Sequence, residues 1–252
     1  MMRITDTVKH LLIINVVMFI GAKAIGNGEL FYRWFALYFP ENDLFQPWQI
    51  ITHMFMHHKT FYLHIIFNML GIWMFGSPVE NFLGRKKFLF LYFSAGLGAV
   101  LLPWLIHSFN FNSLISPLIE NGFDKDYILS TLNEGKINTQ WKDIIGQSNL
   151  DKLTRIFFTS SLGASGALMG LLVAFGMLFP NAKLMMIFLP IPIKAKIFIP
   201  LLLGYEIISG FTGGNSLFGV SVAHFAHVGG ALTGFVIMYF WKKDQFNKNR
   251  WN

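Results

Sequence analysis

The sequence predicts an all-α membrane protein, a bundle of six transmembrane helices with both termini on the cytoplasmic side. Three observations support this prediction. Of the 252 residues, 54% are hydrophobic and only 13% are charged, whereas soluble domains carry about 25% charged residues. Apolar runs recur along the chain at lengths near the roughly 20 residues that cross a bilayer. The basic residues gather beside the ends of these runs, as they do on the inner side of membrane proteins.

Composition also excludes several classes of protein. The mean hydropathy of +0.49 and the 28 phenylalanines indicate that lipid covers much of the surface. The chain has no cysteine, so it holds neither a disulfide framework nor a thiolate metal site. The formal net charge of +7 does not indicate a nucleic-acid partner, because the basic residues stand next to apolar runs, where they suit anionic lipid headgroups. The expected partner is therefore the lipid bilayer.

Six apolar segments are the predicted spans. The first follows Arg3 and Lys9 and resembles a signal peptide, but no small-residue cleavage site precedes polar sequence, so we predict a retained anchor. The fourth and fifth segments carry Gly, Ser or Pro near their ends. Irregular backbone at membrane depth needs surrounding protein or a water-filled cavity, and we expect such a cavity here. The predicted spans are residues 10–25, 61–78, 86–106, 163–180, 194–211 and 222–241.

The orientation follows from the positions of lysine and arginine. With a cytoplasmic N-terminus, most basic residues lie inside and close to span ends. The outer segment at about 107–154 is acidic on balance. We therefore predict a single membrane domain, residues 1–252, with a long polar outer loop at about 107–154. The aromatic first outer loop, about 26–60, is expected to lie in the membrane interface. The inner basic residues are Arg3, Lys9, Arg85, Lys86, Lys87, Lys183, Lys194, Lys196, Lys242, Lys243, Lys248 and Arg250.

Polar residues inside these spans are the candidate functional groups, because burying them in hydrocarbon is costly. The second span carries His64 and Asn68, four residues apart and so on one helix face. Ser165 stands near the start of the fourth span, and His227 near the start of the sixth. Counted at 1.5 Å per helical residue, His64, Ser165 and His227 each lie roughly 21 Å from the inner end of their spans. Three helices therefore carry polar groups in one layer.

Small residues predict how these helices could approach. On the fourth and sixth spans, glycine or alanine recurs at a spacing of four, and such stripes allow close helix contact in lipid. The contact would bring Ser165 within reach of His227. The residues of the two stripes are Gly166, Gly170, Ala174, Gly230 and Gly234.

These groups predict nucleophilic catalysis. A serine hydroxyl becomes a good nucleophile when a neighbouring base removes its proton, and an imidazole suits that task near neutral pH. Ser165 is thus the candidate nucleophile and His227 the candidate base. The turn from Gly163 to Ser165 offers backbone N–H groups at a helix start, and with His64 and Asn68 it is the expected oxyanion hole.

The same residues resemble a known family, the rhomboid intramembrane serine proteases. The resemblance rests on H-x-x-x-N at His64 and Asn68, G-x-S-G at residues 163–166, and A-H-x-x-G-x-x-x-G at residues 226–234, in order along residues 8–242. It implies a six-helix core, a Ser–His dyad without an aspartate, and hydrolysis of transmembrane protein substrates from a pocket that opens outward. It also implies that His57 assists the oxyanion region or holds water. No cofactor and no metal are expected.

The chain departs from the family pattern in three places. The family often has Trp-Arg in the first loop where this chain has Trp48 and Gln49, so the polar contacts of that loop are expected to differ. Two extra residues separate His57 from His64. The loop at 107–154 is longer than a minimal rhomboid needs. The segment from Val79 to Gly84 resembles a structural junction of the family.

Other interpretations of single residues remain open. His53 and His57 have the spacing of zinc ligands, yet H-E-x-x-H is absent and no acidic residue accompanies them. Glu206 is the one carboxylate well inside a span. It could serve a proton relay, but a structural role is favoured, either facing the cavity or pairing with a hydroxyl such as Ser209.

Two other functions compete with proteolysis. A catalytically inactive rhomboid-like protein could bind membrane clients, although such relatives typically lack the serine or the histidine. A small transporter could use histidine and Glu206 as a proton path. The short termini and the lack of a targeting peptide favour a bacterial inner membrane. Substrate identity and oligomeric state do not follow from the sequence.

Overall fold

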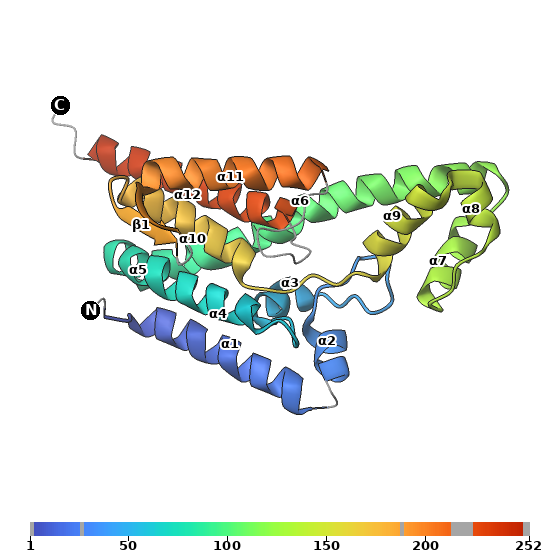
Figure 1. Ribbon diagram of the computed structural model, residues 1–252, viewed down its shortest axis with the longest axis horizontal. Coiled ribbons are helices and arrows are strands. Elements are labelled where there is room, and N and C mark those ends of the chain that lie inside the picture. Colours follow the sequence, from blue (N-terminus) through green and yellow to red (C-terminus); the bar gives the residue numbers. More distant parts are fainter. Residues whose placement is uncertain (1–2, 26–27, 187–188, 213–223, 249–252) are drawn as a thin grey trace.

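The computed structural model describes residues 3–25, 28–186, 189–212 and 224–248, most of which are helical (Figure 1). Short elements connect the long helices: α2 (Glu29–Phe35), α3 (Gln49–Thr52) and the 3₁₀ turn η2 (His53–Phe55) before α4, and β1 (Lys183–Met186) with β2 (Leu189–Lys194) before α11. The helices that form the bundle are α1 (Asp6–Ala24), α4 (Tyr62–Gly71), the π-helical turn η3 (Ile72–Gly76), α5 (Ser77–Leu83), α6 (Arg85–Glu120), α10 (Ser165–Leu178), α11 (Ala195–Thr212) and α12 (His224–Lys248).

Each of the six predicted apolar segments falls mainly on helix, the sixth from His224 onward. Among the described residues, four continuous helical stretches are long and apolar enough to cross a membrane: Asp6–Ala24, Tyr62–Leu83, Arg85–Glu120 and Ala195–Thr212. Helix α10 is apolar but has 14 residues, and so is about 21 Å long. Helix α10 is therefore shorter than the ~30 Å hydrocarbon layer, and extended chain precedes it.

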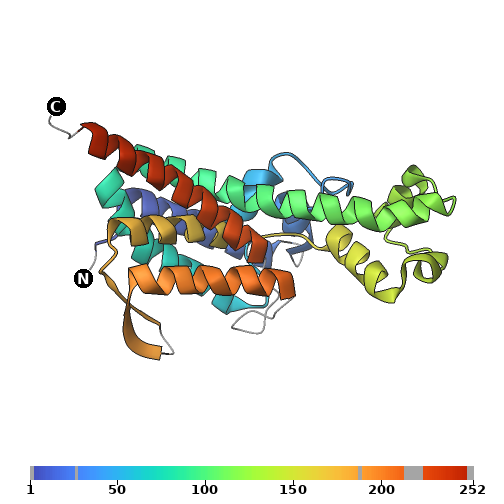
Figure 2. The same ribbon diagram turned by 90° about the horizontal axis from the view of Figure 1, so that it is seen from above.

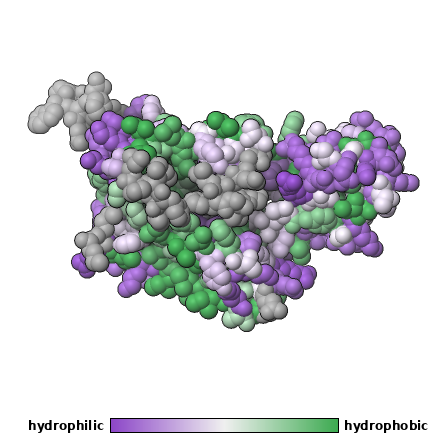
Figure 3. Space-filling view, viewed as in Figure 1, coloured by the Kyte–Doolittle hydropathy of each residue, from purple (hydrophilic) through white to green (hydrophobic). Residues whose placement is uncertain are grey.

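Large apolar side chains cover the outside of the bundle. They lie on α1, α6, α11 and α12, where a soluble protein would carry charges. The space-filling view shows these apolar residues over the bundle and hydrophilic residues over the projecting part of the chain (Figure 3). The chain is therefore an integral membrane protein whose bundle is bounded by lipid. Representative residues are Val17, Ile20, Leu101, Leu105, Leu201, Ile208, Leu232 and Phe240.

The segment at 107–154, expected as a polar loop, is instead helical. Helix α6 continues to Glu120, and α7 (Lys125–Asn133), α8 (Gln140–Ile145) and α9 (Gln147–Phe158) fold back against it (Figures 1 and 2). A hydrophobic cluster of its own holds this extension together, centred on Phe111, Leu118, Trp141, Leu153 and Phe157. The polarity of the segment concealed this structure, because its helices are amphipathic and bury one apolar face each.

Helices α6, α10 and α12 pack together most extensively and form the centre of the bundle. Their backbones approach closely because small residues occupy the crossings. A side chain at Gly170 would lie 2.9 Å from the backbone oxygen of Gly230, and one at Gly234 would lie 2.6 Å from the Cα of Gly170. A side chain at Gly166 would overlap Ala99 of α6. The glycine stripes thus set how near Ser165 and His227 can come.

The junction before Gly84 ties α1 to the bundle. The buried carboxylate of Glu80 accepts hydrogen bonds from the backbone N–H of Thr7 (3.3 Å) and of Val8 (3.1 Å), and from the hydroxyl of Thr5. A carboxylate at a helix N-terminus satisfies free N–H groups and complements the helix dipole. Glu80 therefore has a structural role, as the resemblance implied for this segment.

The first loop is held by Gln49, the residue at which the chain departs from the family pattern. Its side chain is completely buried and makes four hydrogen bonds. The oxygen accepts from the N–H groups of Tyr38 (3.3 Å) and Gln46 (3.1 Å), and the amide donates to the carbonyls of Arg33 (3.1 Å) and Leu44 (2.8 Å). A neutral amide thus supplies both donors and acceptors to a loop that has no regular hydrogen bonding of its own.

Replacing Gln49 with alanine is expected to lower the free energy of unfolding by about 3 kcal/mol, because buried backbone groups lose their partners. Thermal unfolding in detergent measures the effect. The exposed Gln140, replaced in the same way, is the matched control and should change stability little. Equal stability of the two variants would contradict the assignment of Gln49 as the centre of the loop.

Candidate active site

Ser165 is the first residue of α10, at the end of an extended segment that comes from α9. The segment is fixed on both sides: Leu37 and Ser161 pair as an antiparallel β-bridge, and the N–H of Gly163 donates to the carbonyl of His53 at 2.9 Å. The sequence folds this way because Gly163 takes a φ of +122°, which side-chain-bearing residues rarely adopt. The chain thereby turns sharply and presents Ser165 at the helix start.

Ser165 and His227 meet between α10 and α12. The Nε2 atom of His227 lies 2.9 Å from the Oγ atom of Ser165, which is a hydrogen-bond distance. The imidazole is largely buried, with 13% of its side chain exposed. With the proton on Nδ1, Nε2 accepts the hydrogen bond from the serine hydroxyl. This is the arrangement of a serine nucleophile with its base.

His64 faces the same small space from α4. The position that a side chain would occupy at Gly163 lies 2.9 Å from Nε2 of His64 and 3.7 Å from Oγ of Ser165. An L-residue at 163 would therefore fill the gap between the two groups. The glycine leaves that gap open, bordered by a nucleophile on one side and an imidazole on the other.

Two of the other predicted oxyanion donors already make hydrogen bonds within the protein. Asn68 is buried, and its amide donates to the backbone carbonyl of His64 at 2.7 Å, so at least one of its hydrogens is used within its own helix. The N–H of Gly163 is also used, by His53. At the start of α10, in contrast, Ala164 provides no side-chain cap, so the N–H of Ser165 has no capping side chain.

His57 and His53 support this region from outside the spans. His57 is fully buried, donates from Nε2 to Oδ1 of Asn15 at 2.9 Å, and packs its ring edge-on to His64 at 5.1 Å. Burial lowers the pKa of His57 to about 3, with a further contribution from His64, and burial lowers the pKa of His53 to about 4. Both imidazoles are therefore neutral near pH 7, and His57 packs against the ring of His64.

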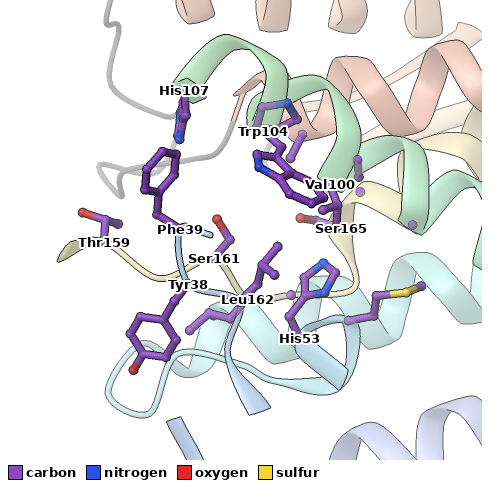
Figure 4. Close-up of a pocket in the computed structure, with 18 of the residues that line it drawn as sticks. Tyr38, Phe39, His53, Val100, Trp104, His107, Thr159, Ser161, Leu162 and Ser165 are labelled. Atoms are coloured by element: carbon purple, nitrogen blue, oxygen red, sulfur yellow. The ribbon is translucent and has the colours of Figure 1, made fainter. Parts of the chain in front are cut away.

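A cavity lies beside Ser165, on the side of α6 and the extension (Figure 4). It encloses about 70 Å³, enough for water. Ser165, Trp104 and His53 border it at one end, and Phe39 and Ser161 border it further out. The cavity thus gives the hydroxyl of Ser165 a space that can hold water, although most of the side chains that line it are apolar.

The contact of Glu206 with two histidines, behind the ring of His227, was not anticipated. Oε2 of Glu206, on α11, lies 3.1 Å from Nδ1 of His227 and 2.7 Å from Nδ1 of His224. The preferred sequence interpretation, a cavity-facing carboxylate or a pair with Ser209, is replaced by this double contact with histidine. The signal that could have indicated it was His224 itself, three residues before His227 and so near it on one helix face.

The histidines of the first loop do not form a metal site in the described ranges. No group of three or more His, Cys, Asp or Glu side chains that could hold an ion occurs among residues 3–25, 28–186, 189–212 and 224–248. His53 instead makes a hydrogen bond from Nδ1 to the carbonyl of Gln49 at 2.9 Å.

Comparison with known proteins identifies the family. The model of the Rhomboid domain matches residues 44–123 and 124–243, which together form most of the chain. The chain belongs to the rhomboid family. Its relatives include the mitochondrial Rhomboid protein 1 of Saccharomyces cerevisiae, which is 26% identical over 193 residues. This alignment covers 76% of the present chain and 40% of the yeast protein.

Membership of the rhomboid family agrees with the residues that suggested it. The two matched stretches include His64 and Asn68 on α4, Ser165 on α10 and His227 on α12. They also meet inside the extension, between Phe123 and Asp124, so that the extra helices lie within the rhomboid domain. The yeast relative is mitochondrial and gives no support to the bacterial inner membrane expected from the sequence.

Proposed function

We propose that this rhomboid is an intramembrane serine endopeptidase, with Ser165 as nucleophile and His227 as general base. The observation that carries the proposal is the distance of 2.9 Å between Oγ of Ser165 and Nε2 of His227. The two residues come from different helices, 62 positions apart in the sequence. Polar side chains are costly inside an apolar bundle, and those that occur there usually have a function.

The proposed reaction follows the usual course of acyl transfer. As Oγ of Ser165 bonds to the carbonyl carbon of the scissile peptide, its proton passes to Nε2 of His227. The histidine then protonates the leaving amine as the C–N bond breaks, leaving an acyl-enzyme. Water attacks the ester with His227 again acting as base, and the cavity beside Ser165 is a suitable source of that water. As the bond between the acyl carbon and Oγ breaks, His227 returns the proton to Oγ of Ser165 and the acid product leaves.

The negative charge that develops on the carbonyl oxygen needs donors. The imidazole of His64 borders the open space beside Gly163, and the N–H of Ser165 stands at a helix start without a side-chain cap, so both suit this role. Asn68 is proposed as a further donor, which requires its amide to turn from the His64 carbonyl or to use its second hydrogen. Each oxyanion donor contributes about 3 kcal/mol to transition-state stabilisation in comparable sites.

The proposed substrates are transmembrane proteins, and the proposed topology is six spans with both termini in the cytoplasm. Helix α1 begins and α12 ends at the same end of the bundle, which agrees with an even number of crossings (Figure 1). Helix α6 extends beyond the bundle at the opposite end. Over 36 residues it is about 54 Å long, which exceeds the ~30 Å hydrocarbon layer. The α7–α9 extension would then lie on the outer side.

Labelling by a serine-directed fluorophosphonate tests the proposed function. The purified protein is expected to form a covalent adduct at Ser165, seen by mass spectrometry of the peptide that contains it. The Ser165→Ala variant should form none, and His227→Ala should react at least about a hundredfold more slowly, since general-base catalysis is lost. A parent protein that stays unlabelled would support the other candidate function, a rhomboid-like protein that binds membrane clients without cleaving them.

A further inference from the structure

A buried carboxylate stands directly behind the base. Glu206 lies on an apolar helix, α11, with 7% of its surface exposed. An ionised carboxylate in such a place is strongly destabilising unless it is paired. Among the described residues, the partners of this carboxylate are two histidines: Oε2 faces Nδ1 of His227 and Nδ1 of His224. The second of these, at 2.7 Å, is a hydrogen bond.

The imidazole of His227 lies between Ser165 and Glu206. Ser165 contacts Nε2 of His227, and Glu206 is close to Nδ1 on the other side of the ring. A carboxylate next to Nδ1 favours the tautomer that carries its proton there. The lone pair of Nε2 is then free to accept the serine proton. The same carboxylate also stabilises the imidazolium that forms when the proton arrives.

The contact between Glu206 and His227 is close but not fully aligned. At 3.1 Å the atoms are within ion-pair distance, yet the Nδ1 hydrogen does not point at the oxygen well enough to make a hydrogen bond. Catalytic hydrogen bonds are often poorly aligned in the free enzyme and tighten when substrate binds. His224 holds the same oxygen from α12 and so keeps the carboxylate in front of its neighbour.

We propose that Glu206 is a positioning residue that converts the Ser165–His227 pair into a Glu–His–Ser triad. The role rests on the proposed protease function and deepens it. The proton of Ser165 moves to Nε2 of His227 as Oγ attacks, and the same proton leaves with the amine. Glu206 stays ionised throughout, fixes the tautomer and orientation of His227, and neutralises the transient imidazolium.

The test compares Glu206→Gln with Glu206→Asp by steady-state cleavage of a transmembrane model substrate in detergent. Glutamine keeps the size of the side chain but loses the charge, and its amide can donate to Nδ1 and so favour the wrong tautomer. It is expected to lower kcat by about a hundredfold, less than the roughly ten-thousandfold loss when the acid of an aligned soluble triad is made an amide. KM should stay the same, because Glu206 does not touch substrate.

Aspartate keeps the charge on a shorter side chain and is expected to retain more activity than glutamine. A purely structural role for Glu206 predicts the reverse order, because glutamine preserves the packing and aspartate leaves a gap. The ranking of the two variants therefore separates the roles. If Glu206→Gln keeps the parent kcat, or has a higher kcat than Glu206→Asp, the proposed triad is wrong.

A matched control is Glu80→Gln. Glu80 is also a buried carboxylate on the bundle, but its hydrogen bonds go to Thr5, Thr7 and Val8 at the start of α1. This variant should unfold at a lower temperature and keep the parent kcat. The rate of fluorophosphonate labelling at Ser165 is measured on every protein. If the parent is labelled and active and the Glu206→Gln variant has the same kcat, only the proposed triad is overturned. If the parent is not labelled, the protease function and the triad are overturned together.

Discussion

Cleavage of a transmembrane substrate is expected to fall by at least about ten-thousandfold when Ser165 or His227 is replaced with alanine. The estimate follows from serine proteases, in which the nucleophile and its base act as one unit. Because they act as a unit, the double variant should be no slower than either single variant. The measurement is single-turnover cleavage of a reconstituted substrate, with product identified by mass.

Matched controls separate catalysis from folding in this experiment. Ser116→Ala and His10→Ala remove an exposed hydroxyl and an exposed imidazole outside the site, and both should cleave at the parent rate. Thermal unfolding should be similar for the parent, the two controls and Ser165→Ala, since Ser165 contributes a single hydroxyl to the packing. Parent-like cleavage by Ser165→Ala would contradict the protease assignment outright.

Adding a single methyl group at Gly230 is expected to destabilise the bundle by about 3 kcal/mol or more, at the upper end of the cost of overpacking a core. The new Cβ would overlap the backbone carbonyl of Gly166 on α10. A backbone atom cannot move aside as a flexible side chain can, so α10 and α12 would have to separate. Separation would also lengthen the contact between Ser165 and His227, and activity should fall with stability.

The control for Gly230→Ala is Gly204→Ala. Gly204 lies on α11, and nothing stands within 4 Å of the position of its missing side chain. Alanine there should keep or slightly raise the unfolding temperature in detergent, because it is the better helix former. Equal unfolding temperatures for the two variants would mean that the close crossing of α10 and α12 does not hold the bundle together.

The extension shows where polarity misleads a sequence-based prediction. In the bundle, lipid requires nearly continuous apolar runs, and these are visible in the sequence as six segments. Outside the membrane a helix needs only one apolar face, so α7, α8 and α9 appear polar on average. Their shared core, with Trp141 and Phe157 fully buried, depends on contacts between segments that the sequence does not pair.

The first loop shows the same limit for a single residue. The sequence shows that this chain has Gln49 where the family often has arginine, and altered polar contacts were expected from this difference. Which groups Gln49 satisfies depends on how residues 33 to 46 fold around it, and that fold has no periodic pattern to predict it. The amide is central because the loop brings four backbone groups to one point.

By itself, the sequence determined the membrane class, the apolar segments and the polar residues that a bilayer would not otherwise tolerate. Solvation alone decides these, since a charged or polar group in hydrocarbon is costly wherever it lies on the helix. Only the tertiary structure decided which of those groups touch. The rotation of α11 about its axis turns Glu206 toward His224 and His227 of α12, and this rotation is set by packing between helices, not by hydropathy.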